Sequence, residues 1–538
     1  MEYPNAIRDV VLDGHSLTLE QLVAVARFGA KVSLSPKALE AMALSRALVE
    51  RISDEKRVAY GISTGFGDFA KVAVPEEMSS RLSTNLILSH SVATGEPYSI
   101  EQTRAMVLLR ANALCAGLSG VRPLMVQTLV DMLNRGVTPV VPQKGSLGAS
   151  GDLAPLSHIG LVLLGKGEAW FGGERLPGGE AMERAGIPIL DSFASKEGLG
   201  MTNGTCAMTG VGALCLYDSM EAARMADVIG AMSFTALCGQ RATFQDRMHI
   251  ARGQLGQILV ARNLRLLTED SEILNNAEGE RVQDAYALRC IPQVHGAVRD
   301  ALHYIRTKVE IELNAVTDNP LLFLEDEAVI SCGNFHGEPM ALAFDFLGIA
   351  LSELASMSER RIERMVNANL SNGLPPFLAL EGGVNSGYMI VQYSAASMAS
   401  ENKVLAHPAC VDSIPSSANQ EDFVSMGTTS ARKATWILEN TRSVLAYELL
   451  TACQAIDIRR RMNTHGQGMS PACEALFNRV RQDIEFSPDD RELRVDIEKI
   501  EQIMRCGELQ QLIEEACPAL KTNQWPGGKY TIKLETER

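Results

Sequence analysis

The sequence lacks the cysteine and histidine patterns of disulfide-rich and metal-binding proteins. Its 11 cysteines are an odd number, and no two of them form a Cys-x-x-Cys pair. Small secreted scaffolds and zinc ribbons depend on such closely spaced pairs, so both classes are excluded. The 9 histidines show no His-Glu-x-x-His spacing, and we therefore expect no bound metal. Scattered cysteines are expected to be small buried apolar side chains.

Positive charge is also scarce. Fifty Lys and Arg residues face 65 Asp and Glu residues, which gives a net charge of −15. An acidic chain repels nucleic acid and anionic lipid unless it carries a concentrated basic patch. The densest basic runs, Arg360–Arg361 and Arg459–Arg461, are too short for that purpose. We therefore expect no nucleic-acid partner.

Long hydrophobic runs are missing as well. The N-terminus, with Arg8 and Asp9 near its start, has no apolar signal-peptide core. The longest uncharged stretch, Gly198–Tyr217, contains five glycines and several threonines, so it is too polar for a membrane span. The sequence therefore predicts a cytoplasmic protein without a membrane partner.

What is present is an abundance of helical signals. Thr18 and Gln21 form a capping-box pattern before an apolar helical repeat that stops at Gly29. Ser35 and Pro36 are typical of the start of a second helix. A short strand is expected at residues 10–17, before the first of these helices.

Two later segments predict much longer helices. Ala341–Met365 and Ser430–Ile456 each run about 25 residues without proline. At 1.5 Å per residue such helices are roughly 40 Å long, and helices of that length usually pack side by side as a bundle. We expect a mainly α fold with an N-terminal domain over residues 1–200, a long-helix bundle over 201–520 and a C-terminal arm over 521–538.

The segment Gly145–Leu156 departs most from ordinary helix or strand composition, since seven of its twelve residues are Gly, Ala or Ser. It could be a glycine-rich turn capped by Ser150 or Asp152. A phosphate-binding loop is disfavoured, because Asp152 stands where such a loop needs a lysine. A third possibility is covalent. The nitrogen of Gly151 can attack the carbonyl of Ala149, and two dehydrations then give an imidazolone whose exocyclic methylene comes from Ser150.

The motif Gly148–Leu153 resembles the signature of the aromatic amino acid ammonia-lyase and aminomutase family. In that family Ala-Ser-Gly forms the electrophile 4-methylidene-imidazol-5-one (MIO). The resemblance therefore implies that Ala149, Ser150 and Gly151 form the cofactor, with no metal and no pyridoxal phosphate. It also implies the fold of the fumarase/aspartase-like superfamily, with the MIO in a smaller N-terminal domain.

The segment Tyr60–Gly67 resembles the tyrosine loop of the same family, although Ser63 replaces the Asn of many relatives. The resemblance makes Tyr60 the catalytic base and places Gly67 next to the substrate. A tyrosine acts as a base near neutral pH only if its pKa, ordinarily about 10, is lowered. We therefore expect nearby donors to lower the pKa of Tyr60.

Further motifs follow in the order of the family, and they extend the resemblance over nearly the whole chain. By resemblance, Asn203 and Phe335 bind the cofactor, Tyr286 is a second catalytic tyrosine, and Arg289 holds the substrate carboxylate. An arginine matches a carboxylate bidentately. The remaining positions that the resemblance assigns to the site are Gln283 on the substrate and Glu421 in the segment Asn419–Asp422.

Three positions distinguish substrates within the family. Ser89-His90, Met389 and Glu421 all stand in the form that the resemblance links to histidine. A carboxylate can accept the N–H of an imidazole, whereas beside a phenyl ring it would be buried without a partner. Phe423 departs from the pattern, because histidine enzymes often carry His there.

We therefore expect deamination of L-histidine to trans-urocanate and ammonia, with His90, Met389 and Glu421 around the imidazole. The resemblance leaves open whether the amine or the ring of the substrate attacks the electrophile. The alternatives are a tyrosine ammonia-lyase, an aromatic 2,3-aminomutase and a non-catalytic scaffold paralogue. Family members are homotetramers with shared active sites, so Tyr60 and Arg289 are expected from different subunits.

Overall fold

The computed structural model describes residues 3–65, 67, 71–72, 74–505 and 508–522. The chain forms two compact units: unit 1 comprises residues 1–217, 305–345 and 408–435, and unit 2 comprises residues 218–304, 346–407 and 436–538. This division differs from the contiguous domains expected from the sequence. The long helices α9, α14, α15 and α17 each contribute residues to both units, so no linker or change of composition marks a boundary. Most of the expected C-terminal arm lies outside the described residues.

Unit 1 is built mainly from short and medium helices with small sheets between them. Its elements are η1 (Pro4–Ala6), β1 (Asp9–Leu12), α1 (Leu19–Phe28), β2 (Lys31–Leu34), α2 (Pro36–Asp54), α3 (Glu76–His90), β3 (Thr94–Pro97), α4 (Ile100–Cys115), α5 (Pro123–Arg135), β4 (Thr138–Pro139), β5 (Pro142–Lys144), α6 (Leu153–Leu163), β6 (Glu168–Phe171), β7 (Glu174–Pro177), α7 (Gly178–Arg184), α8 (Glu197–Thr202), β8 (Leu321–Phe323), β9 (Ala328–Ile330) and η5 (Ser417–Asn419).

In the described part of unit 2 the regular elements are all helices. Its own elements and the long helices shared with unit 1 are α9 (Cys206–Ala236), η3 (Arg241–Phe244), α10 (Asp246–Arg252), α11 (Leu255–Thr268), α12 (Glu272–Ala277), α13 (Tyr286–Arg289), α14 (Ile291–Glu312), α15 (Glu338–Val366), η4 (Pro376–Leu378), α16 (Met389–Leu405), α17 (Gly427–Met462), α18 (Pro471–Asp483), α19 (Leu493–Arg505), α20 (Glu508–Ala516) and α21 (Ala519–Thr522). The expectation of a mainly α fold is confirmed.

The predicted helix starts are confirmed by their caps. The Thr18 hydroxyl accepts a hydrogen bond from the Gln21 backbone N–H, and the Thr18 backbone N–H donates one to Gln21 Oε1. Helix α1 ends at Gly29 in the left-handed conformation. Ser35 caps α2, with Pro36 as its first residue. Side-chain caps satisfy backbone donors that the first turn of a helix leaves unpaired.

Removal of the α1 cap has a small, local expected effect. The Thr18→Ala variant leaves the first-turn N–H groups without their side-chain acceptor, which costs about 1 kcal/mol. Amide hydrogen exchange in the first turn of α1 is therefore expected to become about fivefold faster, while exchange in α2 stays unchanged. Unchanged exchange in α1 would show that tertiary packing alone holds this helix.

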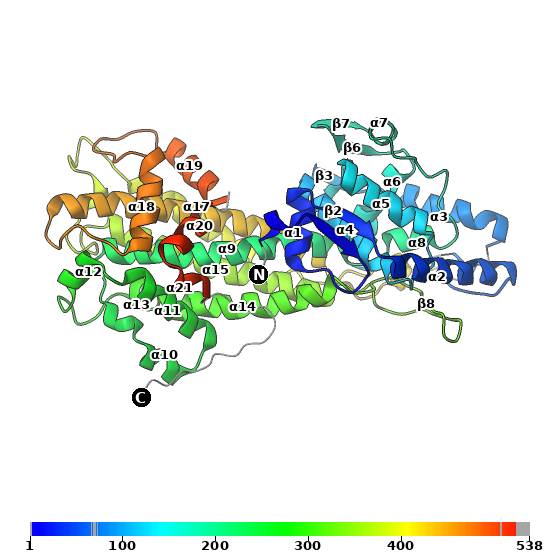
Figure 1. Cartoon of the computed structure of the whole chain (residues 1–538), viewed down its shortest axis with the longest axis horizontal. Helices are drawn as coiled ribbons and strands as arrows, with labels where there is room; N and C mark the ends of the chain where they lie inside the picture. The colour runs from blue at the N-terminus through cyan, green and yellow to red at the C-terminus, as the bar shows by residue number, and fades with distance from the viewer. Residues whose placement is uncertain (1–2, 66, 68–70, 73, 506–507, 523–538) are drawn as a thin grey trace. The chain divides into compact units, whose positions relative to one another are not determined.

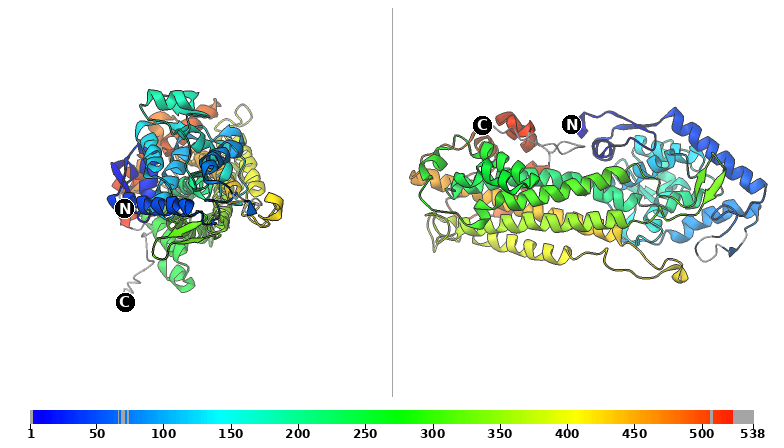
Figure 2. Two further views of the ribbon diagram at one scale, coloured as in Figure 1. Left: turned by 90° about the vertical axis from the view of Figure 1, so that its right-hand side faces the viewer. Right: turned by 90° about the horizontal axis from the view of Figure 1, so that it is seen from below.

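The two predicted long helices are also present and are longer than predicted, as α15 and α17. The parts of α14 (green) and α15 (yellow-green) that belong to unit 2 run side by side in Figure 1 and in the right-hand view of Figure 2. Within unit 2, Arg361 of α15 forms a fully buried ion pair with Glu448 of α17, and Ser233 of α9 donates to the same carboxylate. Buried charges are tolerated only when they are paired in this way.

A glycine in the uncharged stretch Gly198–Tyr217 allows close packing of an aromatic ring. In unit 1, a Cβ atom on Gly212 of α9 would lie 2.0 Å from the ring of Phe344 on α15, so glycine lets the aromatic ring approach the helix backbone.

Among the described residues, α15 is the one helix long and apolar enough to cross a membrane, and 61% of its most apolar window is buried within the chain. That burial is typical of a core helix.

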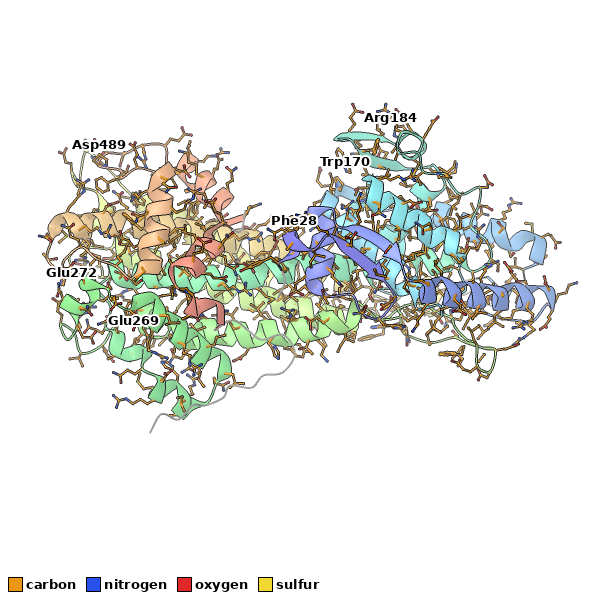
Figure 3. All side chains as sticks on the ribbon, viewed as in Figure 1. Phe28, Trp170, Arg184, Glu269, Glu272 and Asp489 are labelled. Atoms are coloured by element: carbon orange, nitrogen blue, oxygen red, sulfur yellow. The ribbon has the colours of Figure 1, made fainter. Side chains whose placement is uncertain are left out.

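The sheets are small, with two or three strands each. The parallel pair β1–β2 places Val10 opposite Val32, and the three-stranded sheet has the antiparallel order β4-β6-β7. Trp170 lies on β6, and Arg184 at the end of α7 pairs with Glu174 of β7 at 2.8 Å (Figure 3). These side chains belong to the surface of unit 1 rather than to its cavity.

Candidate active site

Three helices of unit 1, α3, α6 and α8, pack against one another and bring separate parts of the sequence together (Figure 1). His90 is the last residue of α3, Asn203 follows the last residue of α8, and the Ala149–Gly151 segment lies just before α6. The packing therefore gathers these predicted residues at one place. They border a cavity of about 820 Å³ whose lining includes Tyr60, Gly67, His90, Ser150, Asn203 and Glu421.

The Ala149–Gly151 segment sits in a tight backbone cradle. Gly151 has φ +77°, and a Cβ atom there would lie 2.2 Å from the carbonyl oxygen of Gly204. The two glycines pair as a parallel bridge: Gly204 N–H donates to Ser150 O at 3.3 Å, and Asp152 N–H donates to Gly204 O at 2.7 Å. Only glycine fits at position 151 by space and by backbone conformation.

Asp152 holds this cradle in place through hydrogen bonds of its side chain. Its fully buried carboxylate accepts hydrogen bonds from Ser146 Oγ at 2.9 Å, from Met208 N–H at 2.8 Å and from the hydroxyl of Thr428. Burial raises the pKa of Asp152, and these hydrogen bonds oppose the rise. The carboxylate does not cap its own helix, α6, but binds the first turn of α9. The simple capping explanation of this segment is therefore wrong for Asp152.

Glu421 lies next to the side chain of Ser150. Its Oε1 atom accepts a hydrogen bond from Ser150 Oγ at 3.0 Å, and its Oε2 atom accepts one from Ser416 Oγ at 2.9 Å. Ser416 and Glu421 also exchange two backbone hydrogen bonds across a loop in which residues 417–419 all have positive φ. Non-glycine residues pay a strain energy in that conformation, so the surrounding fold holds this loop in place.

Tyr60 is held by its neighbours in sequence. Ala59 and Ile62 are buried in an apolar cluster with Leu48, Val49 and Ile52 of α2 and with Leu322, and this cluster fixes the turn that carries Tyr60. Ser63 accepts from Ala59 N–H and donates to Arg57 O, so its hydroxyl serves the turn. Phe66 lies outside the described residues.

The pKa of Tyr60 is raised, whereas the sequence predicted that it would be lowered. Burial raises the pKa, and the Glu421 carboxylate raises it further. Gly67 N–H, the donor that the described residues offer at 3.2 Å from the phenol oxygen, lowers it only in part. A phenolate next to a carboxylate is disfavoured because two like charges repel. The prediction that nearby donors lower this pKa is therefore wrong for the described chain.

His90 is oriented from one side of its ring. Ser89 Oγ lies 2.9 Å from His90 Nδ1. Burial lowers the pKa of His90, while a hydrogen bond to the Leu86 carbonyl and the charge of Glu421 act in the opposite direction. A histidine with a lowered pKa is neutral at pH 7, so its unprotonated ring nitrogen can accept a hydrogen bond.

Asn203 is buried, with one half of its carboxamide unpaired. Its Nδ2 donates to the carbonyl of Asn319 at 3.1 Å, while its Oδ1 is buried without a hydrogen-bond partner. Arg110 donates to the backbone oxygen of Asn203 at 2.7 Å. An orphaned buried polar atom at a cavity wall is unusual enough to require an explanation.

Five predicted site residues do not line the cavity of the chain. Gln283, Tyr286, Arg289 and Met389 belong to unit 2, whereas Phe335 belongs to unit 1. The guanidinium of Arg289 lies 4.8 Å from the ring centre of Tyr286, and Arg289 Nε is buried without a hydrogen-bond partner. The assigned roles of these five residues stay predictions.

Phe423, the residue that departs from the family pattern, is also absent from the cavity lining. Its ring stacks on His336 with ring centres 5.9 Å apart, and its backbone oxygen accepts from His336 Nε2 at 3.3 Å. In the described chain the departure is therefore a packing contact.

Among the polar residues of the site that sequence reasoning missed are Asn319 in the cavity lining and Ser416 on Glu421. No motif marks either position, because each acts through a contact made only in the folded chain. The described residues contain no cluster of three or more His, Cys, Asp or Glu side chains that could hold a metal. Their ten cysteines are free thiols, mostly buried.

Comparison with known proteins agrees with this geometry. A family model described as "Aromatic amino acid lyase" matches residues 17–482. A protein named histidine ammonia-lyase from Caldanaerobacter subterraneus subsp. tengcongensis is 52% identical over 509 residues, which cover 95% of this chain and 99% of that protein.

Solved structures give the same result. Histidine ammonia-lyase from Trypanosoma cruzi has a TM-score of 0.88 at 38% identity, covering 98% of this chain and 100% of its own. Tyrosine aminomutase from Streptomyces globisporus has a TM-score of 0.89 at 37% identity, covering 94% and 99%. The family match spans most of the chain and includes the cavity and the Ala149–Gly151 cradle. This chain belongs to the aromatic amino acid lyase family.

Proposed function

We propose that this chain is a histidine ammonia-lyase, which converts L-histidine to trans-urocanate and ammonia. The observation that carries the proposal is the Glu421 carboxylate, hydrogen-bonded to Ser150 at the wall of the cavity. A carboxylate beside the reacting group suits an imidazole, which can donate to it, and does not suit a phenyl ring. The extensive similarity to proteins named histidine ammonia-lyase supports the same substrate.

Ala149, Ser150 and Gly151 fit the precursor of the MIO group. The Gly151 cradle has no room for a Cβ atom, which suits a glycine nitrogen pressed toward the carbonyl of Ala149. The formed group supplies an electrophile that no ordinary side chain offers. Asn203 lies at the same cavity, and its amide nitrogen is a donor that suits the carbonyl of this group. No metal or pyridoxal phosphate takes part in the proposal.

The other cavity residues divide the work of binding and proton transfer. Tyr60 takes the weakly acidic β-hydrogen of the substrate, and Gly67 N–H stabilises its phenolate. His90 and Glu421 lie on either side of the imidazole, whose N–H donates to the Glu421 carboxylate. Holding the substrate in one orientation lowers the barrier as directly as the base does.

In this proposal the enzyme is a cytoplasmic homotetramer. Its site is completed by five further residues, Arg289, Tyr286, Gln283, Met389 and Phe335. Arg289 is suited to the substrate carboxylate, since its Nε is buried without a partner and its guanidinium forms a planar fork. In this arrangement Tyr60 and Arg289 of one site come from different subunits.

A substrate panel tests the proposed function. Purified protein is incubated separately with L-histidine, L-tyrosine and L-phenylalanine, and the conjugated acrylate is followed by ultraviolet absorbance. Intact mass is expected to be about 36 Da below the sequence mass, for two lost waters. Urocanate alone supports the proposal. Coumarate or a β-amino acid would instead indicate a tyrosine lyase or an aminomutase, and neither product nor mass loss would indicate a non-catalytic paralogue.

Removing the charge of Glu421 is expected to lower kcat/KM for histidine. In the Glu421→Gln variant the imidazole loses its anionic acceptor, so kcat/KM for histidine is expected to fall on the order of 100-fold. Steady-state kinetics measure this, with intact mass confirming the mature cofactor. Glu325→Gln, the same change on the β8–β9 hairpin, is the matched control. An unchanged kcat/KM for Glu421→Gln would remove the main support for histidine.

A further inference from the structure

A fully buried ion pair lies at the start of α8, the helix that ends at Asn203. Lys196 Nζ and Asp318 Oδ2 are 2.6 Å apart, and both side chains have zero exposure. Lys196 occupies the N-cap position of α8 with a positive φ of 71°, and Asn203 occupies its C-cap position. Burying two charges carries a large desolvation cost, and well-packed apolar residues often stabilise such a position as well or better. The pair therefore invites an explanation other than stability.

The second oxygen of the same carboxylate begins a hydrogen-bonded chain that ends at the cavity. Asp318 Oδ1 accepts from the backbone N–H of Asn319 at 2.7 Å. The carbonyl of Asn319 accepts from Asn203 Nδ2 at 3.1 Å, and Asn319 and Asn203 both line the cavity. The Asn319 side chain is held in turn, because its Oδ1 accepts from Cys332 N–H at 2.7 Å.

This series of hydrogen bonds fixes which way the Asn203 carboxamide faces. A backbone carbonyl only accepts hydrogen bonds, so the amide nitrogen of Asn203, and not its oxygen, must lie against Asn319. An amide nitrogen carries two hydrogens, and the bond to the Asn319 carbonyl uses one of them. The second N–H remains available to an acceptor in the cavity. A shift of Asn319 would leave the carboxamide free to rotate.

We propose that Lys196 and Asp318 are positioning residues, which hold the Asn203 carboxamide as a donor toward the cavity through the Asn319 backbone. The inference rests on the proposed function, in which Asn203 serves the carbonyl of the cofactor. Neither residue touches the cavity. Their effect is on the orientation of a group that does.

The Asp318→Asn variant tests this, because it removes the charge but keeps an oxygen that can accept from Asn319 N–H. Once normalised to the fraction of chains with the mature mass, kcat for histidine is expected to fall about 10-fold to 100-fold, with KM changed less than about twofold. The near-ultraviolet absorbance band of the imidazolone is expected to shift relative to wild type, since it reports the donor on its carbonyl. Unchanged kcat per mature site, with an unchanged band, overturns the proposal.

Glu448→Gln is the matched control. It makes the corresponding charge-removing change in the fully buried Arg361–Glu448 pair of unit 2, which lines no part of the cavity. Both variants are expected to lower the melting temperature, whereas only Asp318→Asn lowers kcat per mature site. Equal kinetic losses in the two variants would show that a buried ion pair matters only for stability, and would overturn the proposal.

The double variant Lys196→Met with Asp318→Asn covers the case in which the single variant does not fold. Removing both charges relieves the unpaired lysine, so the melting temperature is expected to recover toward wild type. The reduced kcat and the shifted absorbance band are expected to persist. Recovery of both would overturn the positioning role. Wild-type protein that releases no urocanate would overturn the proposed function, and this inference with it, whereas active wild type with fully active variants overturns the inference alone.

Discussion

Replacing Ser150 with alanine is expected to abolish turnover of histidine. Only the Ser150 side chain can become the methylene carbon of the electrophile, so the variant lacks the group on which the substrate reacts. We expect kcat to fall by at least about 10⁴-fold, well beyond the loss of a single hydrogen bond. The intact mass should no longer show two lost waters, although a single ring-closing dehydration is still possible.

The fold of this variant is expected to survive. Ser150 Oγ makes one hydrogen bond, to Glu421, and Glu421 keeps its second contact with Ser416. The melting temperature and far-ultraviolet circular dichroism should therefore stay close to wild type. Ser157→Ala, which removes a serine hydroxyl bonded to Leu153 O in α6, controls for loss of a hydroxyl near the cavity. A Ser150→Ala protein that retains most of its activity would rule out the proposed chemistry.

Replacing Tyr60 with phenylalanine is expected to have the second-largest effect. Removal of a general base typically costs 10²-fold to 10⁴-fold, so we expect kcat/KM to fall about 10³-fold at pH 9. The pKa of Tyr60 is raised above 10 by burial and by Glu421, so its basic form is scarce at pH 7 and increases with pH. Wild-type kcat/KM should accordingly rise between pH 7 and pH 9.

The comparison across pH isolates Tyr60 from the substrate. Ionisation of the substrate amine affects wild type and Tyr60→Phe equally, so the difference between their slopes reports the phenol. The ratio of the wild-type kcat/KM to that of Tyr60→Phe is expected to increase toward high pH. Tyr98→Phe, another buried tyrosine with a raised pKa that lines no part of the cavity, is the control. Parallel pH profiles for wild type and Tyr60→Phe would exclude Tyr60 as the base.

Local features of the fold were predictable because they depend on neighbours in sequence. The α1 capping box needs only Thr18 and Gln21, and most of α15 follows from the proline-free repeat over Ala341–Met365. The division into units was not predictable. It depends on which parts of the same long helix meet which distant segments, and residues such as Ser430 and Trp436 on α17 belong to different units without any sequence signal.

The site shows the same contrast. The gathering of Tyr60, His90, Ser150, Asn203 and Glu421 at one cavity agrees with the motifs. The pKa of Tyr60 was wrongly expected to fall, because its motif reveals the donor at Gly67 but neither the burial nor the nearness of Glu421, which lies 361 residues away in the chain. Ser416 and Lys196 likewise act through partners that no spacing rule connects.

The narrow fit between Gly151 and Gly204 bears on when the enzyme becomes reactive. The carbonyl of Gly204 reaches Gly151 only after α8 and α9 have folded against the Ala149–Gly151 segment, since the two glycines are more than fifty residues apart in the chain. Under the proposed chemistry, a nascent chain in which these segments have not yet folded together cannot generate a strong electrophile. The cell is thereby spared a protein that would alkylate its thiols before it had a cavity to enclose the reactive carbon, and freshly synthesised enzyme passes through a silent period before its first turnover.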